Sequence, residues 1–290
     1  MVTRNGDVSF WWAELGGPPT PRPAVTHDRS VDVAIVGAGF TGLWTAYALH
    51  EADPSLRIAL VEQRFAGFGA SGRNGGWLTG EFGWSHERLA QVAGADAVIA
   101  LQQQLIASVD EVISVAARHG IDADIVKAGA LRVATSPAEL ARLRASIVHE
   151  ADWGLTQGDS EWIDAEALQS RIAIAGALAA DWSPHAARIQ PAKLVRGLAE
   201  VIEGQGMRIF EGSPVARIEP HRVVTPGGVV TADVVIRATE GFSARLPGSR
   251  RDWLPMNSAM IATAPLTDRQ WAAIGWSGAE VVGDMAHAYC

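Results

Sequence analysis

Apolar and polar residues alternate with different periods along this chain, and the changes of period mark its first elements. Residues 31–36 form a nearly unbroken apolar run, which predicts a strand buried on both faces. Apolar residues then recur at helical spacing from Leu43 to Leu49, and Asp53 with the following proline ends that helix. A second buried strand is predicted over 56–61, closed by Glu62. The pattern therefore predicts a strand–helix–strand unit near the N-terminus.

Helical periodicity dominates the middle of the chain, and short apolar runs dominate its last third. Four further helices are predicted. The first spans 96–119, and the second begins at a capping-box signal at 136–139 and ends at about 153. The third is a short helix that begins after Asp164, and the fourth begins at Pro191 and ends at 204–206. Strands are predicted over 130–135, 176–182, 207–211, 215–219, 222–225, 229–231 and 233–238. The strand at 207–211 follows a helix, so we expect it to be parallel to its neighbour.

The first 29 residues are predicted to form an N-terminal tail. The prolines between residues 18 and 23 forbid a helix there and favour an extended segment on the surface. The three aromatic residues Phe10, Trp11 and Trp12 precede them. No basic face accompanies this trio, so we expect it to pack on its own domain rather than to anchor the chain in a membrane.

Composition and charge narrow the class of protein. Hydrophobic residues make up 48% of the chain and charged residues 19%, enough for a sizeable core. The net charge of −8 argues against broad contact with nucleic acid or anionic membranes. Cys290 is the single cysteine, which excludes an intrachain disulfide and a multi-cysteine metal site. We expect a cytoplasmic protein with no transmembrane span and no bound metal.

The first motif lies at the predicted strand-to-helix junction. Gly37, Ala38, Gly39, Phe40, Thr41 and Gly42 form a G-x-G-x-x-G, and Glu62 ends the second strand 20 positions later. Gly37 allows a tight turn, Gly39 lets the backbone approach a pyrophosphate, and Gly42 lets the helix pack on the strand. Glu62 is placed to accept hydrogen bonds from ribose hydroxyls and would repel a 2′-phosphate. The motif by itself fits FAD and NAD alike.

The second motif is a glycine-rich loop over 67–77. Five glycines in its first ten residues are costly to order, which makes sense if the backbone runs close beside a flat ligand. The interleaved Ser71, Arg73 and Asn74 distinguish it from a plain linker. A third candidate is His185. It is either a general base or a histidine that only holds the loop before the helix that begins at Pro191.

Together these motifs resemble the FAD-dependent oxidoreductases of the D-amino-acid oxidase (DAO) superfamily, in the branch that includes gamma-glutamylputrescine oxidoreductase. The resemblance rests on the G-x-G-x-x-G, the strand-terminal Glu and the run Gly-Ala-Ser-Gly-Arg-Asn-Gly-Gly at 69–76. It continues through residues 190–194 and 238–241 and so covers most of the chain. Glu240 departs from the pattern, because a small or amide residue is commoner there.

The resemblance implies FAD as the cofactor and a set of residues that contact it. Besides the six residues 37–42 and Glu62, the implied contacts are Gln63, Gly69, Ala70, Ser71, Arg73, Asn74, Gly75, Gly76, Val215, Ala238, Thr239 and Gly241. The last four come from the late strands, where small residues let the chain pass the cofactor.

The predicted fold class is α/β, and the chain taken as a whole is predicted to be α+β. We expect a discontinuous Rossmann-like FAD/NAD(P)-binding domain of the GR2 type from residues 30–80 and 185–250, because dinucleotide motifs occur both early and late. Residues 81–184 and 251–290 are expected to form a substrate domain with a mixed or antiparallel sheet.

The resemblance also implies an activity. A C–N bond of a small amine or amino acid is oxidised by hydride transfer to flavin N5, which requires no obligatory acid or base. Two alternatives stay open: an NAD-dependent dehydrogenase, for which the glycine-rich loop has no evident use, and a catalytically inactive, truncated relative. Residues 281–290 are expected to enter the substrate sheet as a strand, and the sequence then stops where similar proteins continue toward the flavin. We therefore expect an unfinished sheet edge, poor expression and little bound FAD.

Overall fold

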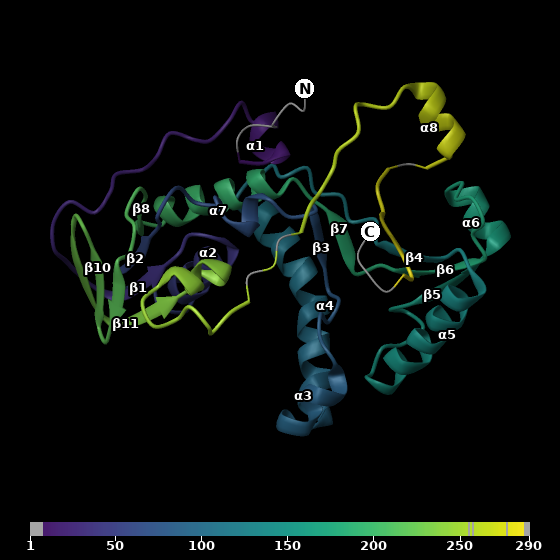
Figure 1. Cartoon of the computed structure of the whole chain (residues 1–290), viewed down its shortest axis with the longest axis horizontal. Helices are drawn as coiled ribbons and strands as arrows, with labels where there is room; N and C mark the ends of the chain where they lie inside the picture. The colour runs from purple at the N-terminus through teal and green to yellow at the C-terminus, as the bar shows by residue number, and fades with distance from the viewer. Residues whose placement is uncertain (1–7, 255, 257, 277, 287–290) are drawn as a thin grey trace. The chain divides into compact units, whose positions relative to one another are not determined.

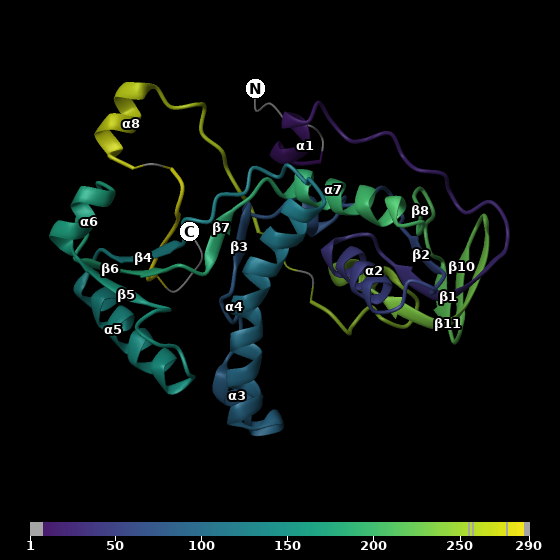
Figure 2. The same cartoon turned by 180° about the vertical axis from the view of Figure 1, so that it is seen from behind.

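The computed structural model describes residues 8–254, 256, 258–276 and 278–286. The expected end of the last strand, including Cys290, lies outside the described residues. The chain forms two compact units. The first unit comprises residues 1–75, 119–123 and 190–262, and the second comprises 76–118, 124–189 and 263–290. Figures 1 and 2 label most of the elements of both units.

The first unit is built on a six-stranded sheet with the order β8-β2-β1-β11-β10-β9. Its strands are β1 (Arg29–Val36), β2 (Ile58–Val61), β8 (Arg208–Phe210), β9 (Arg217–Glu219), β10 (Arg222–Thr225) and β11 (Gly228–Arg237). Neighbours among β8, β2, β1 and β11 run parallel, while β10 pairs antiparallel with both β11 and β9. The expected parallel pairing of the strand near 207–211 is confirmed. Strands β2 and β11, expected to share one domain, lie in the same sheet.

Two helices serve as crossovers between the parallel strands. Helix α2 (Phe40–Ala52) connects β1 to β2, and α7 (Pro191–Gly204) precedes β8. The helix α7 starts with Pro191 in its first turn, where a missing N–H costs nothing, and the Gln190 side chain accepts the N–H of Lys193. Helices α2 and α7 contact each other. Two short 3-10 helices complete the unit, η1 (Ala70–Gly72) and η2 (Glu240–Arg245).

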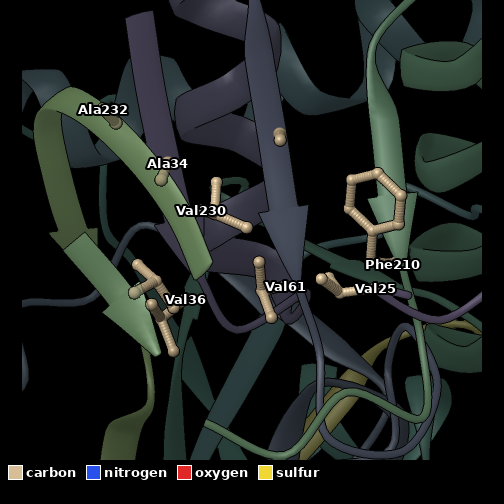
Figure 3. Packing of buried hydrophobic residues seen from close by; sticks show 9 residues of the cluster. Val25, Ala34, Val36, Val61, Phe210, Val230 and Ala232 are labelled. Atoms are coloured by element: carbon tan, nitrogen blue, oxygen red, sulfur yellow. The ribbon is translucent and has the colours of Figure 1, made fainter. Parts of the chain in front are cut away.

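Strand β1 is buried on both faces at its carboxyl end, as its apolar run predicts. On one face, Ala34 and Val36 join a buried cluster with Val61, Phe210 and Val230 (Figure 3). On the other face, the Ile35 side chain approaches Gly42 at the start of α2. The alternation of a strand thus places successive residues in two different parts of the core.

The expected extended tail is wrong for residues 10–14, which form the helix α1 (Phe10–Glu14). This helix ends before the prolines begin, so their exclusion from helices does not reach it. The expectation that the aromatic trio packs on its own domain is confirmed for Trp12, which is fully buried. The segment that follows is also anchored, because Arg22 forms ion pairs with Glu203 and the buried Glu211.

The second unit carries a four-stranded mixed sheet with the order β12-β4-β6-β5. Its strands are β4 (Ala130–Ala134), β5 (Glu161–Asp164), β6 (Ala179–Ser183) and β12 (Val281–Asp284), and β3 (Trp77–Thr79) pairs separately with β7 (Ala186–Arg188). Its helices are α3 (His86–Ala93), α4 (Ala95–Arg118), α5 (Pro137–Asp152), α6 (Ala165–Arg171) and α8 (Asp268–Ile274). Strand β12 is parallel to β4, and the pairs of β6 are antiparallel. The expected capping by Ser136 and Asp164 is confirmed, since each side chain accepts a backbone N–H of its helix.

Several elements differ from the sequence prediction. Helices α3 and α8 and strands β3, β5 and β7 were not predicted. The two strands predicted over 229–231 and 233–238 are one strand, β11, which pairs with β1 in a single register on both sides of Ala232.

Helix α4 bears on the expected absence of a membrane span. By length and composition alone, its 24 residues are long and apolar enough to cross a membrane. This is weak evidence for a membrane, because core helices of water-soluble proteins meet the same criterion. The helix also carries Gln102, which is buried and donates a hydrogen bond from its side chain to the carbonyl of Gly80.

Candidate functional site

A cavity lies in the first unit where β1, β2 and β11 end. Both glycine-rich motifs and the strand-terminal Glu62 line it, together with residues from the late strands. In open parallel sheets, ligands bind outside the carboxyl ends of the strands, so this is the expected place for a site. The lining residues are Val36, Gly37, Gly39, Phe40, Thr41, Val61, Glu62, Gln63, Arg64, Phe68, Gly69, Ala70, Ser71, Val215, Ala238, Thr239, Glu240, Phe242, Arg245 and Leu246.

The three glycines of the first motif are each required by a close approach. Gly37 has a φ of +105°, and a Cβ there would lie 2.4 Å from the carbonyl oxygen of Ala238. A Cβ on Gly42 would lie 2.1 Å from the carbonyl oxygen of Gly37, so the expected close packing of helix on strand is confirmed. A Cβ on Gly39 would lie 2.8 Å from the Ser71 hydroxyl oxygen. Gly39 therefore makes room for the second motif as well as facing the cavity.

The Ser71 hydroxyl joins the two motifs. Its oxygen accepts the backbone N–H of Phe40 at 2.8 Å, at the first residue of α2. The residue that precedes α2 is Gly39, which has no side chain to cap the helix. Ser71 thus supplies from a distant loop the acceptor that an N-cap side chain ordinarily provides.

Glu62 is held by backbone donors at the edge of the cavity. Its two carboxylate oxygens accept the N–H groups of Ala38 at 2.9 Å and Arg64 at 3.0 Å. Burial raises the pKa of Glu62 above its usual value, an effect that the backbone hydrogen bonds only partly offset. A carboxylate has about four acceptor positions, so capacity remains for hydroxyl donors from the cavity.

The late segment contributes Val215, Ala238, Thr239 and Glu240 to the cavity wall. Glu240 has a φ of +44°, a left-handed conformation that glycine and asparagine tolerate better than glutamate. This conformation gives a physical reason to expect a small or amide residue at that position, as the resemblance implies. Three further lining residues, Phe242, Arg245 and Leu246, were not predicted, because no sequence motif marks their segment.

Seven of the residues predicted to contact the cofactor lie outside the cavity lining: Ala38, Gly42, Arg73, Asn74, Gly75, Gly76 and Gly241. Arg73 instead lies over the Phe68 ring and donates a hydrogen bond to the carbonyl of Phe68. The Asn74 amide donates to the carbonyls of Ala70 and Ser71. Arg73 and Asn74 therefore brace the glycine-rich loop from within.

A second cavity lies inside the second unit, and several charged side chains line it. Arg132, Glu150, Glu81, Asp159 and His185 are among its lining residues. Arg132 donates hydrogen bonds to Glu150 at 2.9 Å and to the fully buried Asp181 at 3.0 Å. Burial alone would lower the pKa of Arg132, but these two carboxylates raise it above its usual value.

The remaining groups of this cavity add negative charge. Burial raises the pKa of Glu81 although Arg132 partly opposes the effect. Asp159 lies 2.7 Å from the His185 imidazole and also accepts hydrogen bonds from Thr156. Burial would raise the pKa of Asp159, and these hydrogen bonds lower it below its usual value. His185 therefore has a carboxylate partner within a cavity, a contact that is compatible both with a general base and with a histidine that holds its loop. Among the described residues, no group of three or more His, Cys, Asp or Glu side chains is arranged to hold a metal.

Comparison with known proteins gives the site a family context. The family model described as "FAD dependent oxidoreductase" (DAO) matches residues 32–289. The chain is 29% identical over 269 residues to gamma-glutamylputrescine oxidoreductase of Escherichia coli, covering 90% of this chain and 61% of that protein. It is 30% identical over 264 residues to the probable oxidoreductase OrdL of Rhizobium meliloti, covering 89% and 60%. The chain thus spans about 60% of the length of these relatives.

A solved structure agrees at the level of the fold. The crystal structure of glycine oxidase from Geobacillus kaustophilus superposes with a TM-score of 0.60 at 24% identity, over 77% of this chain and 58% of that one. Because the family model extends over nearly the whole sequence, the chain belongs to the DAO family of FAD-dependent oxidoreductases, whose cofactor is FAD.

Proposed function

We propose that this chain binds FAD in the cavity of the first unit and takes part in oxidising a C–N bond of a small amine or amino acid. The observation that carries the proposal is the meeting of both glycine-rich motifs and Glu62 at one cavity, at the carboxyl ends of β1 and β2. A Cβ at Gly37 would lie 2.4 Å from the carbonyl oxygen of Ala238, and a Cβ at Gly39 would lie 2.8 Å from the Ser71 hydroxyl oxygen, so the lining segments approach one another closely. The cavity is thus a close-walled cradle of the kind that a dinucleotide backbone needs.

The residues present fit FAD in three ways. The N-terminus of α2 offers backbone N–H groups and a positive dipole end to a pyrophosphate. Glu62 keeps acceptor positions for ribose hydroxyls. Apolar walls from Val215 and Phe242 suit aromatic ring systems. When bound, FAD supplies the two-electron acceptor for amine oxidation.

We propose that the first unit is the FAD-binding domain, of the GR2 type and corresponding to the predicted 30–80 and 185–250, and that the second is the substrate domain. The cavity of the second unit supports an amine substrate, because carboxylates outnumber Arg132 among its charged lining residues. Such a lining attracts a cation and disfavours an anion. A cytoplasmic location and the implied contacts of Arg73 and Asn74 stay predictions.

The decisive experiment is spectroscopic. The purified chain is incubated with excess FAD or, in a separate sample, with excess NAD, and is then desalted and scanned for the absorbance of the retained cofactor. The sample with FAD is then mixed anaerobically with a panel of primary and secondary amines and amino acids. Under this proposal flavin is retained and is bleached by an amine, with retention lost in Gly39→Val and weakened in Glu62→Ala. The alternative of a catalytically inactive relative predicts little bound FAD and no bleaching instead. Retention of NAD instead of flavin would support a dehydrogenase, and retention of neither would contradict the proposal.

A further inference from the structure

Helix α1 and the residue before it lie against the glycine-rich loop of the first unit. The Ser9 hydroxyl donates a hydrogen bond to the carbonyl of Gly72 at 2.7 Å. The indole N–H of Trp11 donates to the carbonyl of Asn74 at 2.8 Å. The Gln190 side chain donates to the carbonyl of Trp11 at 3.0 Å, which fixes α1 to the start of α7. The two helices lie side by side in both views (Figures 1 and 2).

Trp12 fills the space that two glycines of this loop leave open. Its side chain is fully buried and meets the Phe65 ring edge-on, with ring centroids 5.1 Å apart. A Cβ on Gly72 would lie 2.5 Å from the Trp12 indole nitrogen, and a Cβ on Gly67 would lie 3.3 Å from its six-membered ring. These two glycines are therefore accounted for by the Trp12 ring and by the chain around it, rather than by a ligand.

The position of Trp12 is costly in hydrogen bonding. Its indole N–H is buried and has no hydrogen-bond partner among the described residues. A buried donor without a partner opposes folding, so the ring contributes through its shape and apolar surface. A phenylalanine would keep much of that surface and remove the unpaired donor.

The loop held by α1 is the same loop that forms one wall of the cavity. Gly69, Ala70 and Ser71 line the cavity, and they lie between the two glycines that Trp12 contacts. Ser71 also accepts the N–H of Phe40 at the start of α2. A change in the position of the loop is thus transmitted both to the cavity wall and to the helix N-terminus.

We propose that Ser9, Trp11 and Trp12, here named the α1 clasp, are positioning residues for the cofactor: the clasp orders the glycine-rich loop in the conformation that accepts FAD. The inference rests on the proposed function. A loop so rich in glycine has many accessible conformations when it is not held. If only one conformation binds, the apparent affinity falls in proportion to the fraction of protein that adopts it.

The test compares Trp12→Ala and Trp12→Phe with Ile202→Ala as a matched control. Ile202 is fully buried on α7 and lies outside both the cavity lining and the clasp, so its truncation lowers global stability alone. We expect the FAD dissociation constant to rise about tenfold or more in Trp12→Ala and to stay within about threefold of wild type in Trp12→Phe. Ile202→Ala is expected to lower the melting temperature and leave the FAD dissociation constant unchanged.

Hydrogen exchange of the FAD-free protein supplies a readout that does not depend on the cofactor. The amide of Gly67, which donates to the carbonyl of Ala38 at 2.9 Å, and the amides of residues 72 and 73 are expected to exchange faster in Trp12→Ala but not in Ile202→Ala. If Trp12→Ala does not fold, Ser9→Ala and Trp11→Phe each remove one hydrogen bond to the loop and are expected to show the same effects in smaller degree.

The outcomes separate the two proposals. Wild-type protein that takes up no FAD overturns the proposed function, and the exchange measurement still decides whether the clasp orders the loop. Wild-type protein that binds FAD, with a clasp variant that binds equally well and protects the loop equally, overturns the clasp. An equal loss of affinity in Ile202→Ala overturns it too, because global stability then explains the effect.

Discussion

Substitution of Gly42 by alanine gives the sharpest test of how the cavity is built. Gly42 lies in the first turn of α2, and an added Cβ would lie 2.1 Å from the carbonyl oxygen of Gly37 and 3.3 Å from a methyl group of Ile35. The nearest neighbour is backbone, so it cannot rotate away as the end of a flexible side chain would. To restore ordinary contact, the start of α2 must move by roughly 1 Å relative to β1.

The expected cost follows from two opposing contributions. Overpacking a well-packed core costs about 1–3 kcal/mol, and a rigid backbone neighbour places Gly42→Ala at the upper end. Alanine is better than glycine in a helix by about 1 kcal/mol. We therefore expect the free energy of unfolding to fall by about 2 kcal/mol. The affinity for FAD should fall as well, because the N-terminus of α2 moves with the helix.

Urea denaturation of the FAD-free protein measures the first effect, and titration with FAD followed by flavin fluorescence measures the second. Gly204→Ala is the matched control, because Gly204 also lies in a helix and a Cβ there meets nothing within 4 Å. We expect it to be neutral or to stabilise by up to about 1 kcal/mol. A Gly42→Ala protein as stable as the Gly204→Ala protein would refute the reasoning.

Three further predictions use single contacts of the two cavities. FAD affinity should already fall at a pH above the usual titration range of a glutamate side chain, because burial raises the pKa of Glu62 and only its charged form accepts from two ribose hydroxyls; a titration series in which Glu62→Gln keeps the full pH dependence would contradict this. Arg132→Met should cost about 3–5 kcal/mol of unfolding free energy, because the buried Asp181 loses its cationic partner, and adding Asp181→Asn should restore part of this loss; additive losses in urea denaturation would argue against the pair. Glu240→Gly should stabilise the FAD-free protein by about 0.5–1 kcal/mol by relieving the φ of +44°, and a lower melting temperature would show that the conformation is not strained.

The elements with strong local patterns could be predicted from the sequence alone. The unbroken apolar run at β1, the periodicity of α4 and the proline at the start of α7 each act within one element. Helix α1 was missed because a five-residue helix is unstable in isolation. Its stability comes from contacts with residues near 72 and 190, which no local pattern reveals.

In the candidate site too, local geometry was predictable from the sequence, and contacts between distant segments were not. The motif at 37–42 predicted its own geometry, because the tight turn and the helix packing occur within the motif. The glycines of the second motif were assigned to a ligand, whereas Gly67 and Gly72 accommodate Trp12 from a segment more than 50 positions earlier. Phe242 and Arg245 were missed because a cavity wall assembled by topology leaves no spacing in the sequence to detect.

The position of β1 in its sheet has a consequence for synthesis. Strand β2 follows β1 after a single helix, but the other neighbour, β11, begins at Gly228, about 190 residues after β1 ends. At a translation rate of about 5–20 residues per second, one edge of β1 stays unpaired for roughly 10–40 s on the ribosome. An apolar strand with an open edge pairs readily with other chains. The yield of folded protein should therefore depend on chaperone access to the nascent chain and on the rate of translation between these two strands.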